Sequence, residues 1–142
     1  MGLYTGSGDL EHDGPLLAVD LSISSALQRS LEAQKQHVPQ SVRCNGLIDT
    51  GSSRTVIRLG LARKLRLNPV STVRARTASG AEEACGVYSV QLILPNGSTA
   101  DLTQAVELPL QEPGIDVLIG RDILSQGMLV YLGTKNEFTL CL

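Results

Sequence analysis

The sequence of 142 residues contains no tryptophan, and its only other aromatic residues are three tyrosines and one phenylalanine. Hydrophobic residues nevertheless make up 42% of the chain, so the core must consist mainly of leucine, valine, isoleucine and alanine. Few aromatic rings disfavour single-stranded nucleic acid as a ligand, because such proteins stack bases on them. The net charge of −2 also lacks the concentrated basic face that phosphates require. We therefore expect no nucleic-acid partner.

Long hydrophobic runs and targeting signals are absent as well. The sequence has no stretch of about eighteen consecutive apolar residues, which a membrane-spanning helix would need. Its first fourteen residues contain neither the basic nor the apolar segment of a signal peptide. Gly2 is compatible with myristoylation, but Gly6 stands where that motif requires serine or threonine. The sequence predicts no membrane association and a cytoplasmic location.

Cysteine and histidine are too few and too widely spaced for an ordinary metal site. Cys44, Cys85 and Cys141 form no Cys-x-x-Cys pair, and the only histidines are His12 and His37. We expect idle or buried thiols in a reducing compartment, with no metal and no cofactor. A serine or cysteine hydrolase is also disfavoured, because neither histidine lies in a convincing strand-end setting.

The length predicts a single domain. Residues 1–14 are rich in glycine and acidic residues without a hydrophobic period, which indicates a flexible tail. The folded domain is then expected to span residues 15–142. Within it, residues 22–41 are interpreted as a possible mobile insertion, in which a short exposed helix over 25–36 and a mobile loop are equally favoured.

Most of the remaining chain predicts short β-strands. Two-residue alternation or β-branched content favours strands, and an uninterrupted apolar run at 117–119 favours a strand buried on both faces. A helix is predicted over 59–67, and a helical turn after Gly120. Many short strands with one or two short helices indicate an all-β barrel or sandwich. A turn is predicted at Gly133-Thr134-Lys135-Asn136, between the last two strands. The expected strands include residues 17–24, 42–48, 55–57, 74–79, 87–94, 102–108, 128–132 and 138–142.

The most informative chemistry lies in Asp49-Thr50-Gly51, where an ionisable side chain follows an apolar strand and enters a tight turn. Glycine lets the neighbouring chain approach closely, and the hydroxyls of Thr50 and Ser52 can hydrogen-bond to hold the carboxylate. Taken alone, the tripeptide is equally compatible with an aspartate that caps its own turn.

Together with the segments around it, this motif resembles the retropepsin family of aspartic proteases over residues 15–142. The likeness is greater to the cellular and bacterial retropepsin-like domains than to the shorter viral enzymes. It implies a closed acid-protease barrel with one flap hairpin per subunit. The matching segments are Asp49-Thr50-Gly51-Ser52, Thr55-Val56-Ile57, the helix at 61–65, the hairpin around Ser79-Gly80, and Asp116 to Leu124.

The resemblance implies that Asp49, Thr50 and Gly51 form the catalytic motif of an aspartic endopeptidase. Two Asp49 carboxylates would share a proton and activate a water molecule, while Thr50 would brace the two active-site loops. The chain has one Asp-Thr-Gly and no Asp-Ser-Gly, so the pair requires a homodimer. The substrate would be a polypeptide, and the strand from Phe138 to Leu142 is a candidate for the dimer sheet.

Further residues are expected to bind the substrate. Ser52 and Arg54 would lie along the groove, and the flap tip would close over the peptide. By resemblance to pepsin-like enzymes, the Ser52 hydroxyl would donate to the outer oxygen of Asp49. The flap tip comprises Ser79, Gly80 and Ala81.

The sequence departs from the viral enzymes at Ser53. In those enzymes an acidic residue at this position pairs with the arginine that matches Arg121, and serine cannot form that ion pair. We expect Arg121 to bind Asp122, Asp116 or a carboxylate of the other subunit. An alternative function is a catalytically silent module that keeps the fold but only binds peptides or dimerises.

Overall fold

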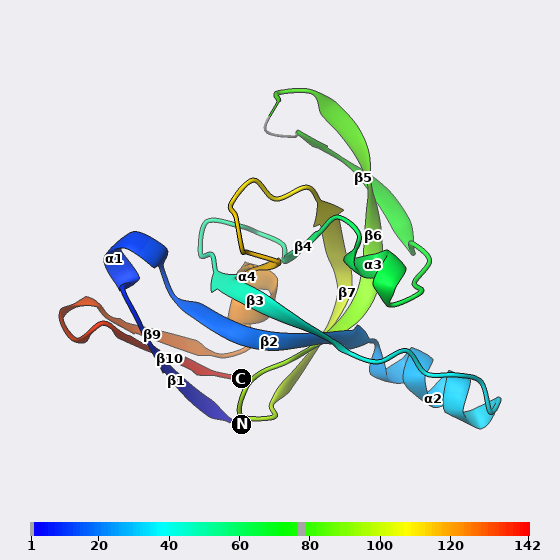
Figure 1. The fold of residues 1–142 in the computed structure, drawn as a ribbon, viewed down its shortest axis with the longest axis horizontal. Helices are drawn as coiled ribbons and strands as arrows, with labels where there is room; N and C mark the ends of the chain where they lie inside the picture. Colours follow the sequence, from blue (N-terminus) through cyan, green and yellow to red (C-terminus); the bar gives the residue numbers. More distant parts are fainter. Residues whose placement is uncertain (1, 77–78) are drawn as a thin grey trace.

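The computed structural model describes residues 2–76 and 79–142, which are mostly β-structure (Figure 1). Among these residues, seven strands form one sheet in the order β2-β3-β8-β4-β7-β6-β5. Because β2 also pairs with β6, the sheet closes into a ring from which β5 projects. The all-β fold class predicted from the sequence is confirmed. The strands are β2 (Leu16–Ile23), β3 (Val42–Ile48), β4 (Val56–Arg58), β5 (Ser71–Arg76), β6 (Glu82–Ile93), β7 (Thr99–Leu108) and β8 (Val117–Ile119).

Strand β8 is an interior strand of the ring, with a neighbouring strand on each side, as expected for the apolar run at 117–119. It pairs in parallel with β3 and antiparallel with β4, and the side chains of Val117 and Ile119 are fully buried. The parallel pairing brings the end of β3 beside the end of β8, with Ile48 opposite Ile119. Two loops distant in sequence therefore leave the sheet together, directly after residues 48 and 119.

The pairing of β6 with β7 contains a register shift between Tyr88 and Val90. From Ala105 to Leu102 the strand β7 advances three residues while β6 advances two, so the extra residue lies in β7. The face expected from the alternation along residues 87–94 is nevertheless kept in β6. Val90, Leu92 and Leu94 are buried in the main core, and Tyr88 packs against it. Val87 belongs instead to a smaller cluster with Cys85 and Val106.

Short helices are more numerous than the one or two expected. The described residues contain α1 (Leu10–Asp13), α2 (Ser25–Ala33), α3 (Leu61–Lys64) and α4 (Arg121–Leu124). None of the described helices is long and apolar enough to cross a membrane.

Segment 22–41 contains α2, so the helical alternative for this segment is the one observed. Its N-cap is Ser24, whose hydroxyl accepts a hydrogen bond from the Leu27 amide at 3.2 Å. The neighbouring Ser25 instead donates its hydroxyl to Asp101 on β7 at 3.0 Å. These side-chain contacts fix the start of α2 against the ring, although the helix has no buried residue.

The expectation of a flexible tail at residues 1–14 is wrong. Residues Leu3–Ser7 form β1, which pairs antiparallel with β10 (Glu137–Cys141), and Leu10 of α1 is only 3% exposed. The ordering partner lies more than 130 residues away in sequence, as the hydrogen bond between the Thr5 and Thr139 hydroxyls shows. A local hydrophobic period does not reveal such pairing.

The second sheet has the order β1-β10-β9, where β9 comprises Met128–Leu132. A 3-10 turn, Gly133–Lys135, joins β9 to β10, as the sequence predicted. Because β10 has a neighbour on each side, its backbone cannot pair with a strand from another chain. The expectation that the last strand, Phe138 to Leu142, forms part of a dimer sheet stays a prediction, in which the neighbours of β10 would make the contact between subunits.

Candidate active site

Asp49 follows the last residue of β3 and lies where β3 and β8 leave the sheet together. Its amide donates to the carbonyl of Ile119 at 2.9 Å, and its own carbonyl accepts from the Ser52 amide at 3.2 Å. These two bonds fix the backbone on both sides of the side chain, which is partly exposed. The carboxylate is therefore presented at the surface by a fixed turn.

The Gly51 amide donates to Oδ1 of Asp49 at 2.9 Å. A Cβ atom at Gly51 would lie only 3.1 Å from the same oxygen, so the absence of a side chain leaves room for this approach. A backbone donor orients the carboxylate without the entropic cost of ordering a side chain. Gly51 therefore acts on Asp49 through its N–H group.

Ser52 does not hold the carboxylate as expected. Its hydroxyl donates to the carbonyl of Arg54 at 2.5 Å. A serine hydroxyl carries one hydrogen, so this bond uses its donor capacity within the loop. The predicted hydrogen bond from Ser52 to Asp49 is therefore wrong for this structure, and Ser52 instead shapes the chain that leads away from the site.

Arg121 holds the loop around Asp49 through hydrogen bonds that the sequence did not predict. Its Nη1 donates to the carbonyl of Thr50 at 2.7 Å, and its backbone amide donates to the carbonyl of Ser52 at 2.8 Å. The expected partners within the chain are engaged elsewhere: Asp116 pairs with Arg58 at 3.4 Å, and Asp122 binds Thr55. The expected pairing with either carboxylate is therefore wrong.

The strongest hydrogen-bonded contact between the two loops is made by Thr55 and Asp122. Thr55 is fully buried, and both its amide and its hydroxyl donate to the Asp122 carboxylate, at 2.8 and 2.7 Å. The same hydroxyl accepts from the Gly120 amide at 3.1 Å. Charge-assisted bonds of this kind are stronger than neutral ones. The sequence offered Asp122 only as a partner of Arg121 and did not identify this contact.

Gly120 allows the two loops to touch. A Cβ atom there would lie 2.6 Å from both the carbonyl carbon and the oxygen of Arg54, and 2.9 Å from the amide nitrogen of Thr55. Real Cβ atoms do not approach backbone so closely, and the backbone φ of −90° is one that any residue adopts. Glycine is therefore needed at this position for space.

A groove of about 400 Å³ lies beside the active-site loop, between β4, β7 and the hairpin of β5 and β6. Strand residues supply an apolar floor, and Arg54 and Arg74 supply charge. Arg54, which the sequence placed on the groove wall, does line this pocket and is exposed. The lining residues are Ser52, Ser53, Arg54, Val56, Val73, Arg74, Ala75, Val106 and Leu108.

The hairpin of β5 and β6 extends away from the ring at the top of Figure 1, as the sequence predicted for a flap. Gly80 at its tip has φ of +83°, in the left-handed region that favours glycine. Its neighbours Ser79 and Ala81 are also exposed at the tip. Residues 77 and 78, which belong to the predicted hairpin, lie outside the described part of the chain.

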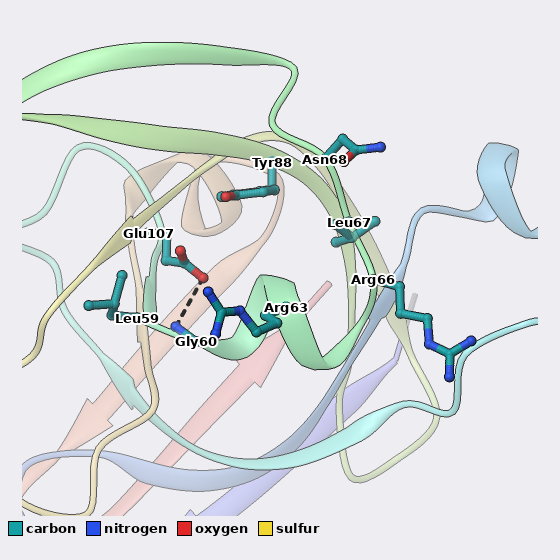
Figure 2. Close-up of a pocket in the computed structure, with 8 residues that line it drawn as sticks. All are labelled: Leu59, Gly60, Arg63, Arg66, Leu67, Asn68, Tyr88 and Glu107. Carbon is teal, nitrogen blue, oxygen red and sulfur yellow. Dashed lines mark hydrogen bonds between the residues drawn. The ribbon is translucent and has the colours of Figure 1, made fainter.

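A second pocket, of about 620 Å³, lies beside α3 and does not include Asp49 (Figure 2). Glu107 reaches into it and accepts hydrogen bonds from the amides of Gly60 and Ala62, at 3.2 and 3.0 Å. Burial and the nearby Glu107 charge raise the pKa of Tyr88 on the opposite wall. Glu107 therefore fixes the start of α3 from within this pocket.

The cysteines are free and buried. Burial, reinforced by the negative charges of Asp116 and Asp20, raises the pKa of the Cys44 thiol from 9.0 to about 11. A thiol of this kind is unreactive at neutral pH. No group of three or more histidine, cysteine, aspartate or glutamate side chains in residues 2–76 and 79–142 is placed to hold a metal ion.

Comparison with known families matches residues 37–123 to the aspartyl protease family. This match covers more than half of the chain and contains the loop with Asp49 and the loop that follows β8. The chain therefore belongs to the aspartyl protease family. A search of curated protein sequences gives no significant match.

Solved structures with the same fold include a retropepsin-like aspartic protease from Rickettsia conorii, at 12% identity and a TM-score of 0.59, with 98% of this chain and 90% of that chain covered. The retroviral protease-like domain of Ddi1 from Leishmania major is 16% identical at a TM-score of 0.50, covering 88% of this chain and 87% of that one. The simian foamy virus protease is 13% identical at a TM-score of 0.50, covering 78% and 92%. The fold is therefore the retropepsin-like fold.

Proposed function

We propose that this chain is an aspartic endopeptidase that works as a homodimer, with one Asp49 from each subunit in the catalytic pair. The observation that carries the proposal is the fixed turn at the end of β3, in which the Gly51 amide and the Ile119 carbonyl hold a partly exposed Asp49. Membership of the aspartyl protease family supports the reaction class.

The chemistry follows from placing two such carboxylates side by side. Two carboxylates about 3 Å apart repel when both are ionised, so the pair holds one proton, as in aspartic proteases as a class. The ionised member accepts a proton from a bridging water, and the protonated member donates to the scissile carbonyl. The water attacks the carbonyl carbon, and protonation of the amide nitrogen then releases the two products without a covalent intermediate.

One chain contains a single Asp-Thr-Gly, so the second carboxylate must come from another copy. Thr50 and Gly51 are exposed next to Asp49, at the place where a second active-site loop would contact the first. In this proposal Thr50 braces the two loops across the two-fold axis. Arg121 and Asp122 hold each loop from behind through Thr50 and Thr55.

The groove beside Arg54 is proposed to receive the polypeptide substrate, and the tip at Ser79, Gly80 and Ala81 is proposed to close over it. The floor of the groove is aliphatic, and the side chain of Arg54 is exposed at its rim. An acidic or polar side chain near the scissile bond should therefore be favoured. Cleavage-site profiles of wild type and Arg54→Ala test this role, since identical profiles would leave Arg54 without a part in recognition.

The decisive experiment incubates the purified protein with an unstructured protein substrate over a range of pH. We expect cleavage that is abolished by Asp49→Ala and blocked by a peptide carrying a transition-state-mimicking hydroxyl. Binding of the same hydroxyl peptide without any cleavage by the wild type would instead support the silent peptide-binding module.

A further inference from the structure

A cavity of about 570 Å³ lies between α2, the segment that follows α3, and β6. Both helices lie on the same side of the ring in Figure 1. The described residues that line the cavity include neither Asp49 nor Arg54. Pockets of about 300–1,000 Å³ typically bind small molecules. The cavity is therefore a candidate binding site that is separate from the candidate active site and its groove.

Aliphatic side chains form most of the cavity wall. Ile23 and Leu65 are each 1% exposed, whereas Leu27 and Val70 are 37% and 60% exposed. Leu27 and Leu31 lie one helical turn apart on α2, so the same face of this helix is turned toward the cavity. Exposed apolar side chains that gather at a concave site favour the binding of an apolar group.

The charged groups of the cavity are basic. Its ionisable lining residues within the described chain are Arg66 and His37, and none is acidic. Arg66 is exposed and belongs to none of the ion pairs in residues 2–76 and 79–142. Figure 2 shows its side chain pointing away from Arg63 and Glu107, the charged residues of the neighbouring pocket. A guanidinium without a carboxylate partner can bind an anionic group through two parallel hydrogen bonds.

The backbone at Arg66 is one that arginine rarely adopts. Its φ of +54° lies in the left-handed region, which glycine or asparagine usually occupies at the end of a helix. The conformation is needed to end α3, because the Leu67 amide donates back to the carbonyl of Ala62 at 2.9 Å. Glycine would satisfy this turn with less strain, and the arginine side chain is exposed. The fold alone therefore does not explain an arginine at this position.

We propose that the cavity binds a small anionic amphiphile, with its apolar chain against Leu27, Leu65 and Val70 and its carboxylate on Arg66. The cation and the apolar wall belong to one cavity, so a single headgroup and a single chain satisfy both. A protein partner would instead need a contact surface of about 800 Å² on each side. The proposal does not depend on the proposed protease activity.

The headgroup is tested by titrating the wild-type protein, in a calorimeter and below micelle-forming concentrations, with octanoate, octanol and octyltrimethylammonium. We expect octanoate to bind about tenfold or more tightly than octanol, because a hydrogen bond to a charged group is added. From hexanoate to octanoate, affinity should rise by up to about fourfold for each added methylene group. Octanoate that does not bind, or binds no better than octanol, would overturn the proposal.

The assignment to Arg66 is tested with Arg66→Gly, which removes the guanidinium and relieves the backbone. This variant should lose the preference for octanoate over octanol, still bind octanol, and unfold at an equal or higher urea concentration than the wild type. Lys35→Gly is the matched control, because Lys35 has φ of +53° at the end of α2, is exposed and does not line the cavity. It should bind octanoate as the wild type does, and equal effects of the two substitutions would contradict a role for Arg66.

Val70→Glu places a carboxylate on the cavity wall and provides a second, independent variant. It should weaken the binding of octanoate and leave that of octanol nearly unchanged, because only the anion is repelled. A folding defect would weaken both, which the octanol titration and urea denaturation detect. Octanoate binding that is unchanged in Val70→Glu would place the carboxylate elsewhere on the molecule and overturn the proposal.

Asp49→Ala separates the cavity from the candidate active site. This variant should bind octanoate as tightly as the wild type, whereas a loss of binding would place octanoate at the active site and overturn the proposal. Binding is measured without any cleavage, so a chain that cleaves no peptide can still uphold the cavity. An acidic, leucine-containing peptide that displaces octanoate and binds more tightly would show that the occupant is a polypeptide instead.

Discussion

The buried hydroxyl of Thr55 donates to the carboxylate of Asp122 at 2.7 Å, and the Thr55 amide donates to the same carboxylate at 2.8 Å. The two residues are 67 positions apart, and each belongs to one of the loops that leave the sheet beside Ile48 and Ile119. This contact joins the loop carrying Asp49 to the start of α4. The contact therefore supports the loop of the candidate active site from its buried side.

Thr55→Val should destabilise the protein by about 2–3 kcal/mol, because it removes a hydrogen bond to a charged group and leaves the Gly120 amide without its acceptor. Valine matches the shape of threonine, so a packing defect does not account for the loss. Urea denaturation measures the change. Thr55→Ser retains the hydroxyl and should recover most of the stability, whereas equal losses in both variants would assign the effect to the missing methyl group.

Gly120→Ala should cost about 1–3 kcal/mol, because the new methyl group would meet the Arg54 carbonyl at 2.6 Å and force the two loops apart. Gly8→Ala is the matched control, since no atom lies within 4 Å of a Cβ placed there. Thermal or urea unfolding of both variants provides the comparison. Equal stability of the two variants would contradict the close approach at Gly120.

Arg121→Gln should lower kcat about ten- to hundredfold while changing the free energy of unfolding by less than about 1 kcal/mol. The guanidinium is exposed and adds little stability, but it fixes the Thr50 carbonyl next to Asp49, and small displacements of a catalytic loop are costly. Arg63→Gln, an exposed arginine on α3, controls for the change in net charge. A loss of kcat in both variants would assign the effect to general electrostatics.

Ser52→Ala should leave the acid limb of the pH–rate profile in place. The Ser52 hydroxyl donates to the Arg54 carbonyl, so its removal takes no donor from Asp49. The Gly51 amide, which does bind Asp49, is unaffected by the substitution. An upward shift of the acid limb in Ser52→Ala, with dimerisation intact, would show that the hydroxyl turns toward the carboxylate in the working enzyme.

The buried thiol of Cys44 should make the protein less stable as the pH rises from about 9 to about 11. Burial raises the pKa of this thiol from 9.0 to about 11, so in this range the unfolded chain has lost a proton that the folded chain keeps. Stability falls with pH wherever the folded state binds more protons, here by at most about 2–3 kcal/mol. Urea denaturation at several pH values should show a shallower decline for Cys44→Ala, and identical slopes would contradict the shift.

Several features of the molecule follow from local sequence. The apolar run at 117–119 predicted a strand buried on both faces. The strand is present, with Val117 and Ile119 fully buried and Leu118, on the other face, partly buried. Gly133 to Asn136 predicted the turn between the last two strands, since a turn depends on a few adjacent residues. The Asp-Thr-Gly motif and the other matching segments, up to residue 124, likewise indicated the aspartic protease fold, because each segment is a short consecutive stretch of the chain and the segments occur in a fixed order.

Only the tertiary structure decided which groups hold the loop around Asp49. From the sequence, Ser52 was the expected donor to Asp49, and Asp122, Asp116 or a carboxylate of the other subunit was the expected partner of Arg121. These expectations came from residues that are adjacent in the chain or matched by a motif. In the fold, the Gly51 amide binds Asp49, Arg121 binds the Thr50 carbonyl, and Asp122 binds Thr55.

The same limit explains the N-terminal residues, which looked like a tail because their partner is the last strand of the chain. Local pattern determines whether a segment favours a strand, a turn or a helix, since those preferences depend on neighbouring residues. Which hydrogen-bonding groups meet depends on how strands distant in sequence pair. The observed strand pairing leaves few buried polar groups without a hydrogen-bond partner in the fold as a whole. The sequence of a single segment therefore does not predict its pairing partner.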